Sequence, residues 1–100
     1  MYDMSNLAKF NDLEQLAPAA FRSFATFDQA AFLGPAIPLK YKELMAVAVA
    51  LTTQCPYCIK LHAQRAREAG ATQPELAETV LVAAALRAGG AVTHGTHALG

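Results

Sequence analysis

The chain has 100 residues, enough for a single domain, and its eight basic and eight acidic side chains cancel to a formal charge of zero. This balance gives no electrostatic reason to bind nucleic acid or an anionic membrane, so we expect neither partner. Hydrophobic residues make up 54% of the chain and charged residues only 16%, which predicts that other subunits cover part of the surface of so small a fold. Abundant alanine and few β-branched residues predict an all-α domain over residues 1–100.

Two helices are expected in the first third of the chain. A short one covers about residues 7–16, with Asn11 or Asp12 capping part of it, and Pro18 opens another over residues 17–33. The second helix carries an aromatic stripe that either packs in the core or forms a hydrophobic wall shielding the cysteines, and these two interpretations are compatible. The stripe consists of Phe21, Phe24 and Phe27 (or Asp28), followed by Ala31, with Phe32 nearby.

The clearest break in the pattern is residues 34–38, which contain one glycine and two prolines. The helix expected after it, over residues 38–53, is apolar on every side between residues 44 and 51, which predicts burial all round. In a chain of this size, full burial is most easily reached with a neighbouring subunit. We take residues 44–51 as the longest apolar run without a charge. This run is far shorter than the ~20 residues of a membrane span.

Cytoplasmic location is the default expectation, because residues 1–6 are polar and lack the basic and apolar segments of a secretion signal. In that compartment two close cysteines are more often catalytic, redox-sensing or metal-binding than structural. The chain has two cysteines, Cys55 and Cys58, and the loop between them is too short for a disulfide to stabilise the fold much.

The cysteines open the helix expected over residues 56–69. Pro56 suits the first helical position, so Cys55 would be the N-cap and Cys58 would lie in the first turn. His62 follows Cys58 by four residues and shares its face of the helix. This helix and the apolar one before it therefore predict an antiparallel hairpin with the cysteine pair at its elbow.

The final third of the chain is expected to hold two more helices after a stop at Gly70. The first has Pro74 at its first position and runs to about Arg87, and the Gly-Gly pair at residues 89–90 stops or kinks it. The second is short and covers residues 91–99. Thr72 or Gln73 would cap the first of these helices with Glu75 in its opening turn, and His94 and His97 are expected in a solvated tail.

The cysteine pair predicts redox chemistry. A thiolate, rather than a thiol, attacks peroxides and disulfides, and a helix N-terminus lowers the pKa of a cysteine placed there. Cys55 and Cys58 both gain from this position, so helix geometry does not rank them. Peroxide would oxidise one sulfur to a sulfenic acid, and the other would condense with it to a disulfide.

Glu43 is the candidate third partner of this chemistry. It lies about ten residues, or roughly 15 Å, before the end of its helix, and His62 lies seven residues, or roughly 10 Å, past Cys55. If the helices fold back antiparallel, the two side chains come nearly level and can relay a proton between carboxylate, imidazole and the thiol of Cys58. The plainer alternatives are that Glu43 interacts only with the helix dipole and that His62 packs in the core or at the surface.

Two other interpretations of the cysteines stay open. Cys55, Cys58 and His62, together with His94 or His97, have the residue types of a tetrahedral zinc site, but structural zinc usually takes a second close ligand pair. The other interpretation is an ordinary pair of buried thiols. We expect neither a metal nor an organic cofactor.

The stretch from Glu43 to His62 resembles the carboxymuconolactone decarboxylase and alkylhydroperoxidase D-like family, in its cysteine-bearing peroxidase branch. The shared pattern is Glu-x11-Cys-x2-Cys-x3-His, which is much more specific than a lone Cys-x-x-Cys because spacing and helical context agree. The core of the match covers residues 38–75. It is carried by Lys42, Glu43 and Leu44, the run 46–51, Cys55-Pro56-Tyr57-Cys58, His62, Ala66 and the break at residues 70–72.

The resemblance implies an all-helical fold that assembles as a trimer or hexamer, and a thiol-dependent peroxidase that consumes hydroperoxides. It makes Cys58 the peroxide-reactive cysteine and Cys55 the resolving one, which meets an unidentified dithiol or protein reductant. Glu43 and His62 would activate the thiol. The decarboxylase branch acts on a lactone without the cysteine pair, so the dithiol argues against that activity here.

The sequence departs from the best-known peroxidase of this family at Tyr57, where that enzyme has a histidine next to its second cysteine. A phenol has an ordinary pKa near ~10 and is a poor proton shuttle at neutral pH. The departure motivates an alternative function, a redox-sensing or disulfide-exchange module with little peroxide turnover.

Overall fold

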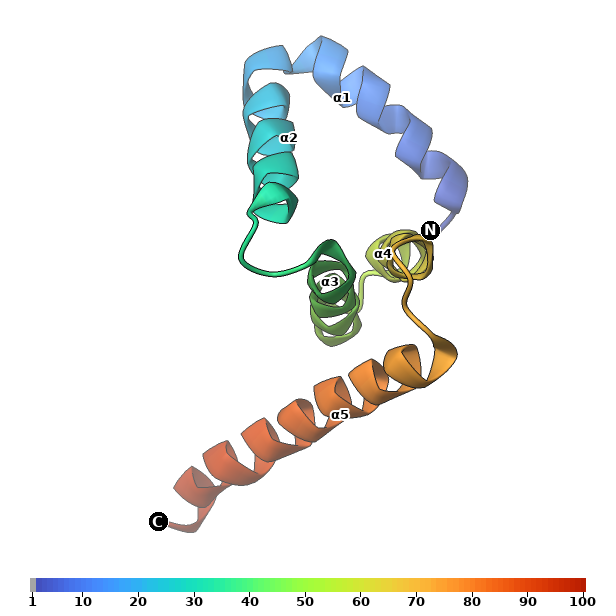
Figure 1. Ribbon diagram of the computed structural model, residues 1–100. Helices are drawn as coiled ribbons and strands as arrows, with labels where there is room; N and C mark the ends of the chain where they lie inside the picture. Colours follow the sequence, from blue (N-terminus) through green and yellow to red (C-terminus); the bar gives the residue numbers. More distant parts are fainter. Residues whose placement is uncertain (1) are drawn as a thin grey trace.

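The computed structural model describes residues 2–100, and over these residues the chain forms helices and no strand (Figure 1). The all-α prediction is therefore confirmed. The elements are η1 (Met4–Lys9), α1 (Phe10–Leu16), α2 (Pro18–Leu33), α3 (Leu39–Thr53), α4 (Pro56–Glu68), α5 (Gln73–Gly95) and η2 (Thr96–Leu99), where η marks a 3-10 helix.

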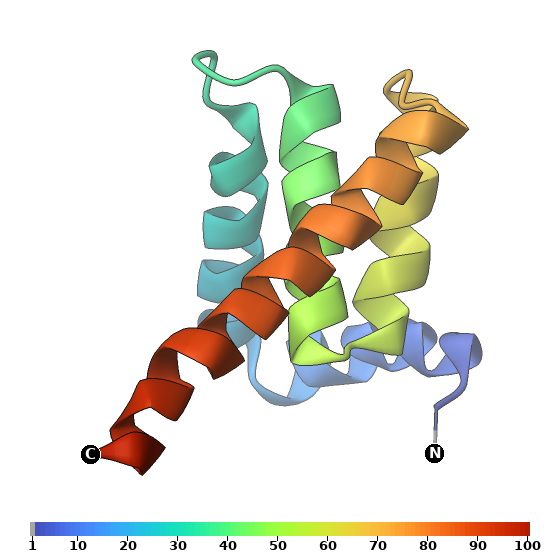
Figure 2. The same ribbon diagram turned by 90° about the horizontal axis from the view of Figure 1, so that it is seen from below.

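The predicted hairpin of α3 and α4 is the centre of the fold. The two helices lie side by side in both views, and α5 crosses them diagonally (Figures 1 and 2). α3 makes most of its tertiary contacts with α4 and α5, and far fewer with α2. The buried core lies where these three helices meet and consists of Leu44, Val47, Ala66 and Leu76.

The elbow of the hairpin is fixed by backbone geometry. Gln54 adopts a left-handed conformation with φ of 57°, and the N–H of Cys55 donates to the carbonyl of Ala50 over 3.1 Å. This arrangement ends α3 and turns the chain at once, as left-handed residues commonly do after a helix. Cys55 is then the N-cap of α4, its sulfur accepting from the N–H of Cys58 at 3.2 Å, and Pro56 holds the first helical position as predicted.

The return from α4 to α5 also follows the predicted signals. Gly70 has φ of 100°, and the N–H of Ala71 donates to the carbonyl of Ala66, which closes the end of α4. Thr72 and Glu75 form a capping box at the start of α5. The backbone hydrogen bond from Thr72 and the Lys40 ammonium, 3.0 Å away, hold the pKa of the Glu75 carboxyl below its ordinary value. The ion pair connects α3 to α5.

The prediction for the start of the first helix was wrong. Asp3, not Asn11 or Asp12, acts as the N-cap, because its side chain accepts from the N–H of Ser5 and starts η1. The chain passes from η1 into α1 at Phe10 without a break, so Asn11 and Asp12 are already inside the helix.

The predicted stop or kink at residues 89–90 was also wrong in placing a helix boundary there. α5 continues through both glycines to Gly95, and only Thr96–Leu99 form a separate turn. Each glycine costs a helix about 1 kcal/mol relative to alanine, which the helix-forming residues on either side offset. Arg87 donates to the carbonyl of Thr52 at 2.6 Å and ties the middle of α5 to the end of α3.

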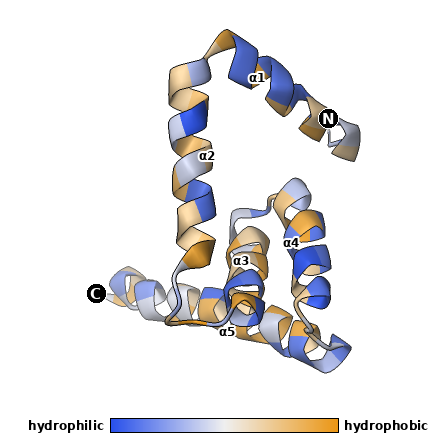
Figure 3. Cartoon of the chain, turned by 45° about the horizontal axis from the view of Figure 1, so that its top comes forward, coloured by the Kyte–Doolittle hydropathy of each residue, from blue (hydrophilic) through white to orange (hydrophobic). Residues whose placement is uncertain are grey.

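A single chain buries little of α2 and α3. In α3, Leu44, Val47 and Ala50 are buried, but Val49 is 59% exposed. No aromatic residue of α2 is buried, and Phe27 is 71% exposed. Neither helix is covered on all sides within one chain, and Figure 3 shows hydrophobic residues spread along α2 and α5.

The extended shape agrees with this exposure. The radius of gyration is 16.6 Å, against about 13 Å for a compact domain of this length. By length and composition alone, residues Gln73–Leu99 also qualify as a membrane-spanning helix, which the apolar run in α3 had not suggested. Only 11% of the relevant window is buried in the single chain, so α5 carries much of the apolar surface that needs a cover.

We propose that copies of this chain cover these surfaces for one another. Light scattering in detergent-free buffer should then give a mass at least three times that of the 10.6 kDa chain. Leu86, on α5, is 69% exposed, and Leu86→Glu should lower the mass because it places a charge in the interface. Gln64→Glu, at an exposed position of α4, is the control and should leave the mass unchanged. A monomeric wild type, or one that associates only with lipid vesicles, would contradict the proposal.

Candidate active site

A hydrogen bond between Glu43 and His62 joins the two arms of the hairpin. The Oε1 atom of Glu43 lies 2.6 Å from Nδ1 of His62, and both side chains are largely buried, with 6% and 14% exposure. An ionised carboxylate only accepts, so Nδ1 carries the hydrogen and Nε2 is the ring nitrogen left for another partner. The antiparallel arms therefore bring these residues level, as the sequence predicted.

Phe32, near the end of α2, stacks on the ring of His62. The two ring centroids are 5.5 Å apart and the planes differ by 7°. The imidazole is therefore held on its edge by Glu43 and on its face by an aromatic ring, which restricts its rotation. The sequence placed Phe32 only beside the aromatic stripe and gave it no role at the site.

The two cysteines form a disulfide across the first turn of α4. Their Cα atoms are 5.3 Å apart, and both residues are half-buried. This is the oxidised form of the dithiol that the spacing predicted. Because Cys55 is the cap and Cys58 lies inside the first turn, a thiolate on either residue would face backbone N–H groups at the positive end of the helix dipole.

Both cysteines and His62 line one cavity of about 500 Å³. Phe24 lines it as well, so that residue of the predicted aromatic stripe does wall the cysteines, whereas Phe21 and Phe27 do not. Glu43 is hydrogen-bonded to His62 but does not line the cavity. The other lining residues are Asn6, Leu7, Phe10, Asp28, Tyr57, Leu61 and Arg65.

The N-terminal segment contributes three of these lining residues, Asn6, Leu7 and Phe10, and the sequence had given them no role. The sequence predicted only a short helix in this region, over about residues 7–16. Their partners on α4 lie some 50 residues away in the chain, and no local sequence pattern predicts such a contact.

Tyr57 holds that segment in place. Its hydroxyl oxygen accepts from the backbone N–H of Asp3 at 3.2 Å and from Nδ2 of Asn6 at 3.1 Å. Its ring also meets the ring of Tyr2 edge-on, with centroids 5.0 Å apart. The residue between the cysteines thus anchors a wall of the cavity, and its hydroxyl is engaged with that wall.

The zinc interpretation gains no support from the positions of its ligands. His94 and His97 lie at the C-terminal end of α5 and in η2, both exposed, with ring centroids 6.1 Å apart. Within residues 2–100, no group of three or more His, Cys, Asp or Glu side chains is arranged to hold a metal ion.

The anchoring role of Tyr57 predicts the effect of removing its hydroxyl. In Tyr57→Phe, the amides of residues 3–9 should exchange hydrogen about 3- to 10-fold faster, because two hydrogen bonds are lost. Dithiothreitol should also reduce the Cys55–Cys58 disulfide a few-fold faster, since the wall beside it loosens. Tyr2→Phe keeps its ring and is the matched control. Unchanged exchange in Tyr57→Phe would show that the hydroxyl does not hold the segment.

Comparison with known sequences identifies relatives of this chain. The sequence profile of the carboxymuconolactone decarboxylase family matches residues 18–99. The chain is 43% identical over 77 residues to "Uncharacterized protein 4 in cox locus" of Paracoccus denitrificans, covering 77% of this chain and 69% of that protein. It is 35% identical over 74 residues to an uncharacterized protein of Cupriavidus necator, covering 74% of this chain and 66% of the relative.

The fold also has a counterpart among solved structures. A crystal structure of a protein from Methanobacterium thermoautotrophicum superposes with a TM-score of 0.78 at 35% sequence identity. The match covers 83% of this chain and 95% of that one. The similarity therefore extends over most of the helices that build the site.

Proposed function

The chain belongs to the carboxymuconolactone decarboxylase family, and on this basis we propose that it is a thiol-dependent peroxidase that reduces hydroperoxides through a Cys55–Cys58 dithiol–disulfide cycle. One observation carries the proposal. His62, which is hydrogen-bonded to the buried Glu43, lines the same cavity as Cys55 and Cys58. A base held by a carboxylate beside a nucleophile is the general arrangement of an activated thiol.

The first step oxidises Cys58. Its thiolate attacks the terminal oxygen of the hydroperoxide, the O–O bond breaks, and the products are a sulfenic acid on Cys58 and an alcohol. His62 takes the thiol proton before the attack and returns a proton to the departing alkoxide, so the step is balanced. Glu43 keeps Nδ1 protonated and stabilises the imidazolium that forms in between.

The second step joins the two sulfurs. The thiol of Cys55 condenses with the sulfenic acid of Cys58 and releases water, which produces the disulfide found in the structure. A dithiol or a protein reductant then reduces the disulfide and becomes oxidised itself. The cycle needs no metal and no organic cofactor. The cytoplasmic location of the protein is a prediction.

A disulfide-exchange or redox-sensing module is the second candidate. The hydroxyl of Tyr57 is bonded to the N-terminal segment, which favours an anchoring role over proton transfer at the dithiol. Peroxide turnover near the uncatalysed rate, together with a readily reduced disulfide, would favour this candidate. A lactone decarboxylase is disfavoured because that reaction has no use for the dithiol.

Replacing each cysteine separately tests the cycle. Cys58→Ser should lower hydroperoxide consumption with a dithiol donor by at least ~100-fold, because the attacking thiolate is gone. Cys55→Ser should still consume about one equivalent of peroxide in a single burst, leaving a sulfenic acid that a dimedone probe traps on Cys58. A burst in Cys58→Ser instead would reverse the roles of the two sulfurs, and unchanged turnover in both variants would remove the proposal.

Replacing the buried carboxylate tests the relay. Glu43→Gln keeps the shape of the side chain but removes its charge, and kcat for peroxide reduction should fall about 10- to 100-fold. Circular dichroism and the rate of disulfide reduction by dithiothreitol should stay close to wild type. Glu78→Gln, at an exposed carboxylate on α5, is the control. Equal rates for wild type and Glu43→Gln would show that the pair is structural only.

A further inference from the structure

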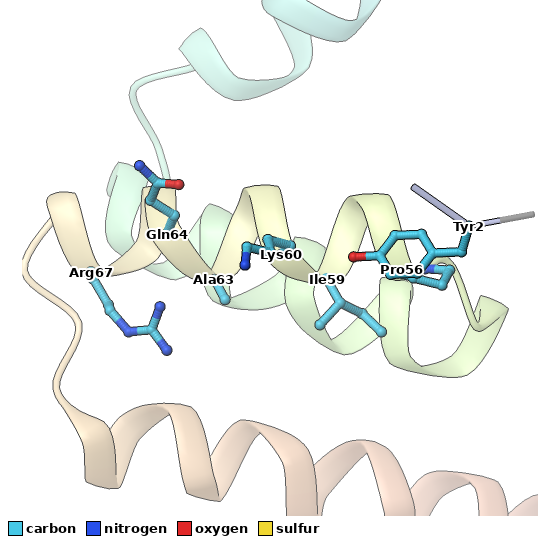
Figure 4. A pocket seen from close by; sticks show the side chains of 7 residues that line it. All are labelled: Tyr2, Pro56, Ile59, Lys60, Ala63, Gln64 and Arg67. Atoms are coloured by element: carbon cyan, nitrogen blue, oxygen red, sulfur yellow. The ribbon is translucent and has the colours of Figure 1, made fainter. Parts of the chain in front are cut away.

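A second cavity lies on the other face of α4, away from the lining of the active site. It has a volume of about 580 Å³ and is open to solvent (Figure 4). Pro56, Ile59 and Ala63 form its apolar floor, Tyr2 covers the end near Pro56, and a polar side made by Lys60, Gln64 and Arg67 completes it. We call this cavity the α4 groove. It begins at Pro56, the residue after Cys55.

Among the described residues, most of the basic side chains that have no ion pair or side-chain hydrogen bond lie on α4. Lys40 and Arg22 pair with carboxylates, and Lys42 and Arg87 donate to backbone carbonyls. Within residues 2–100, four cations have no ion pair or side-chain hydrogen bond, and three of them belong to α4: Lys60, Arg65 and Arg67, with Lys9 as the fourth. A chain with zero net charge thus presents a local positive surface on the helix that carries its dithiol.

Helix stability explains only part of this charge. Arg65 and Arg67 lie in the last turn of α4, where cations interact favourably with the helix dipole. Lys60 lies beyond the first turn and far from the last one, so the dipole gives no reason for a cation there. Lys60 and Arg67 do share the groove, one on its side and one at its far end.

We propose that the α4 groove binds a carboxylate-bearing segment of the protein that reduces the disulfide, next to that protein's own thiols. This inference rests on the proposed function, because it assigns a recognition surface to the reductant of the same dithiol. Lys60 and Arg67 are seven residues apart, or about 10 Å along the helix. Side chains on an extended chain share a face only at even spacings, roughly 7 Å apart at two positions and roughly 13 Å apart at four. The groove therefore fits acidic side chains four positions apart, whose flexible stems take up the difference, with apolar contact between them.

A second copy of the chain is a poorer occupant. A symmetric contact through the groove would bring like charges together, since both copies would present the same lysine and arginine. The apolar surface that needs a cover lies on α2, α3 and α5 instead. Self-association through those helices leaves α4 available.

The exchange step is balanced without a further reactant. A thiolate of the partner attacks the sulfur of Cys55, the Cys55–Cys58 bond breaks, and Cys58 leaves as a thiolate. A second thiol of the partner then attacks the mixed disulfide, so Cys55 is released as a thiolate and the partner ends as a disulfide. Two protons pass from the partner's thiols to Cys55 and Cys58.

Charged dithiol peptides test the inference on the intact, oxidised protein. The probes are a Cys-x-x-Cys peptide with two glutamates four residues apart and the same peptide with lysines in their place. In low salt the glutamate peptide should reduce the disulfide about 5- to 10-fold faster, and the preference should fall as salt screens the charges. Lys60→Gln/Arg67→Gln should lose the preference, whereas Lys9→Gln/Arg22→Gln, which removes the same two residue types, should keep it.

The outcomes separate this inference from the proposed function, because disulfide reduction is measured without peroxide. A preference that depends on Lys60 and Arg67 supports the groove even if peroxide turnover is absent. Equal rates for the two peptides in wild type, or a preference lost equally in both double variants, would overturn the groove and leave the peroxidase proposal standing.

Discussion

The hydrogen bond between Glu43 and His62 is the contact on which the site depends. A carboxylate with 6% exposure is costly to bury unless it is paired, and the imidazole is the partner that α4 supplies. The pair fixes how far α4 slides along α3, and it orients the ring whose far nitrogen serves the cavity. The elbow at Gln54 and Cys55 makes this alignment possible, because it reverses the chain within two residues and leaves the sulfurs at the start of α4.

The cavity itself is built from distant parts of the chain. The N-terminal segment reaches across to α4 and is held there by Tyr57, and α2 adds Phe24 to the lining and Phe32 to the back of His62. A residue between the two sulfurs that bonds the cavity wall couples any movement of the redox turn to that wall. This gives Tyr57 a physical role that differs from acid–base chemistry.

In the proposed redox cycle, the two faces of α4 serve different reactants. One face turns the sulfurs and the imidazole toward a largely apolar cavity, and the opposite face exposes a groove with cations on its side and at its far end. Under this proposal the cavity receives the hydroperoxide and the groove receives the protein reductant. Cys55, the N-cap of α4, lines the cavity, and the next residue, Pro56, lines the groove.

The sequence by itself determined the all-helical class, the elbow and the stop at Gly70, and it indicated Glu43, Cys55, Cys58 and His62 as candidate site residues, because each follows from local spacing or local backbone preference. The tertiary structure alone decided what surrounds them. The tether from Tyr57 to Asp3 and Asn6, the stacking of Phe32 and the continuous α5 depend on contacts between residues far apart or on the sum of many weak preferences. The apolar faces of α2 and α3 stay exposed within the single chain, since an apolar sequence indicates that a helix needs covering but not which surface covers it.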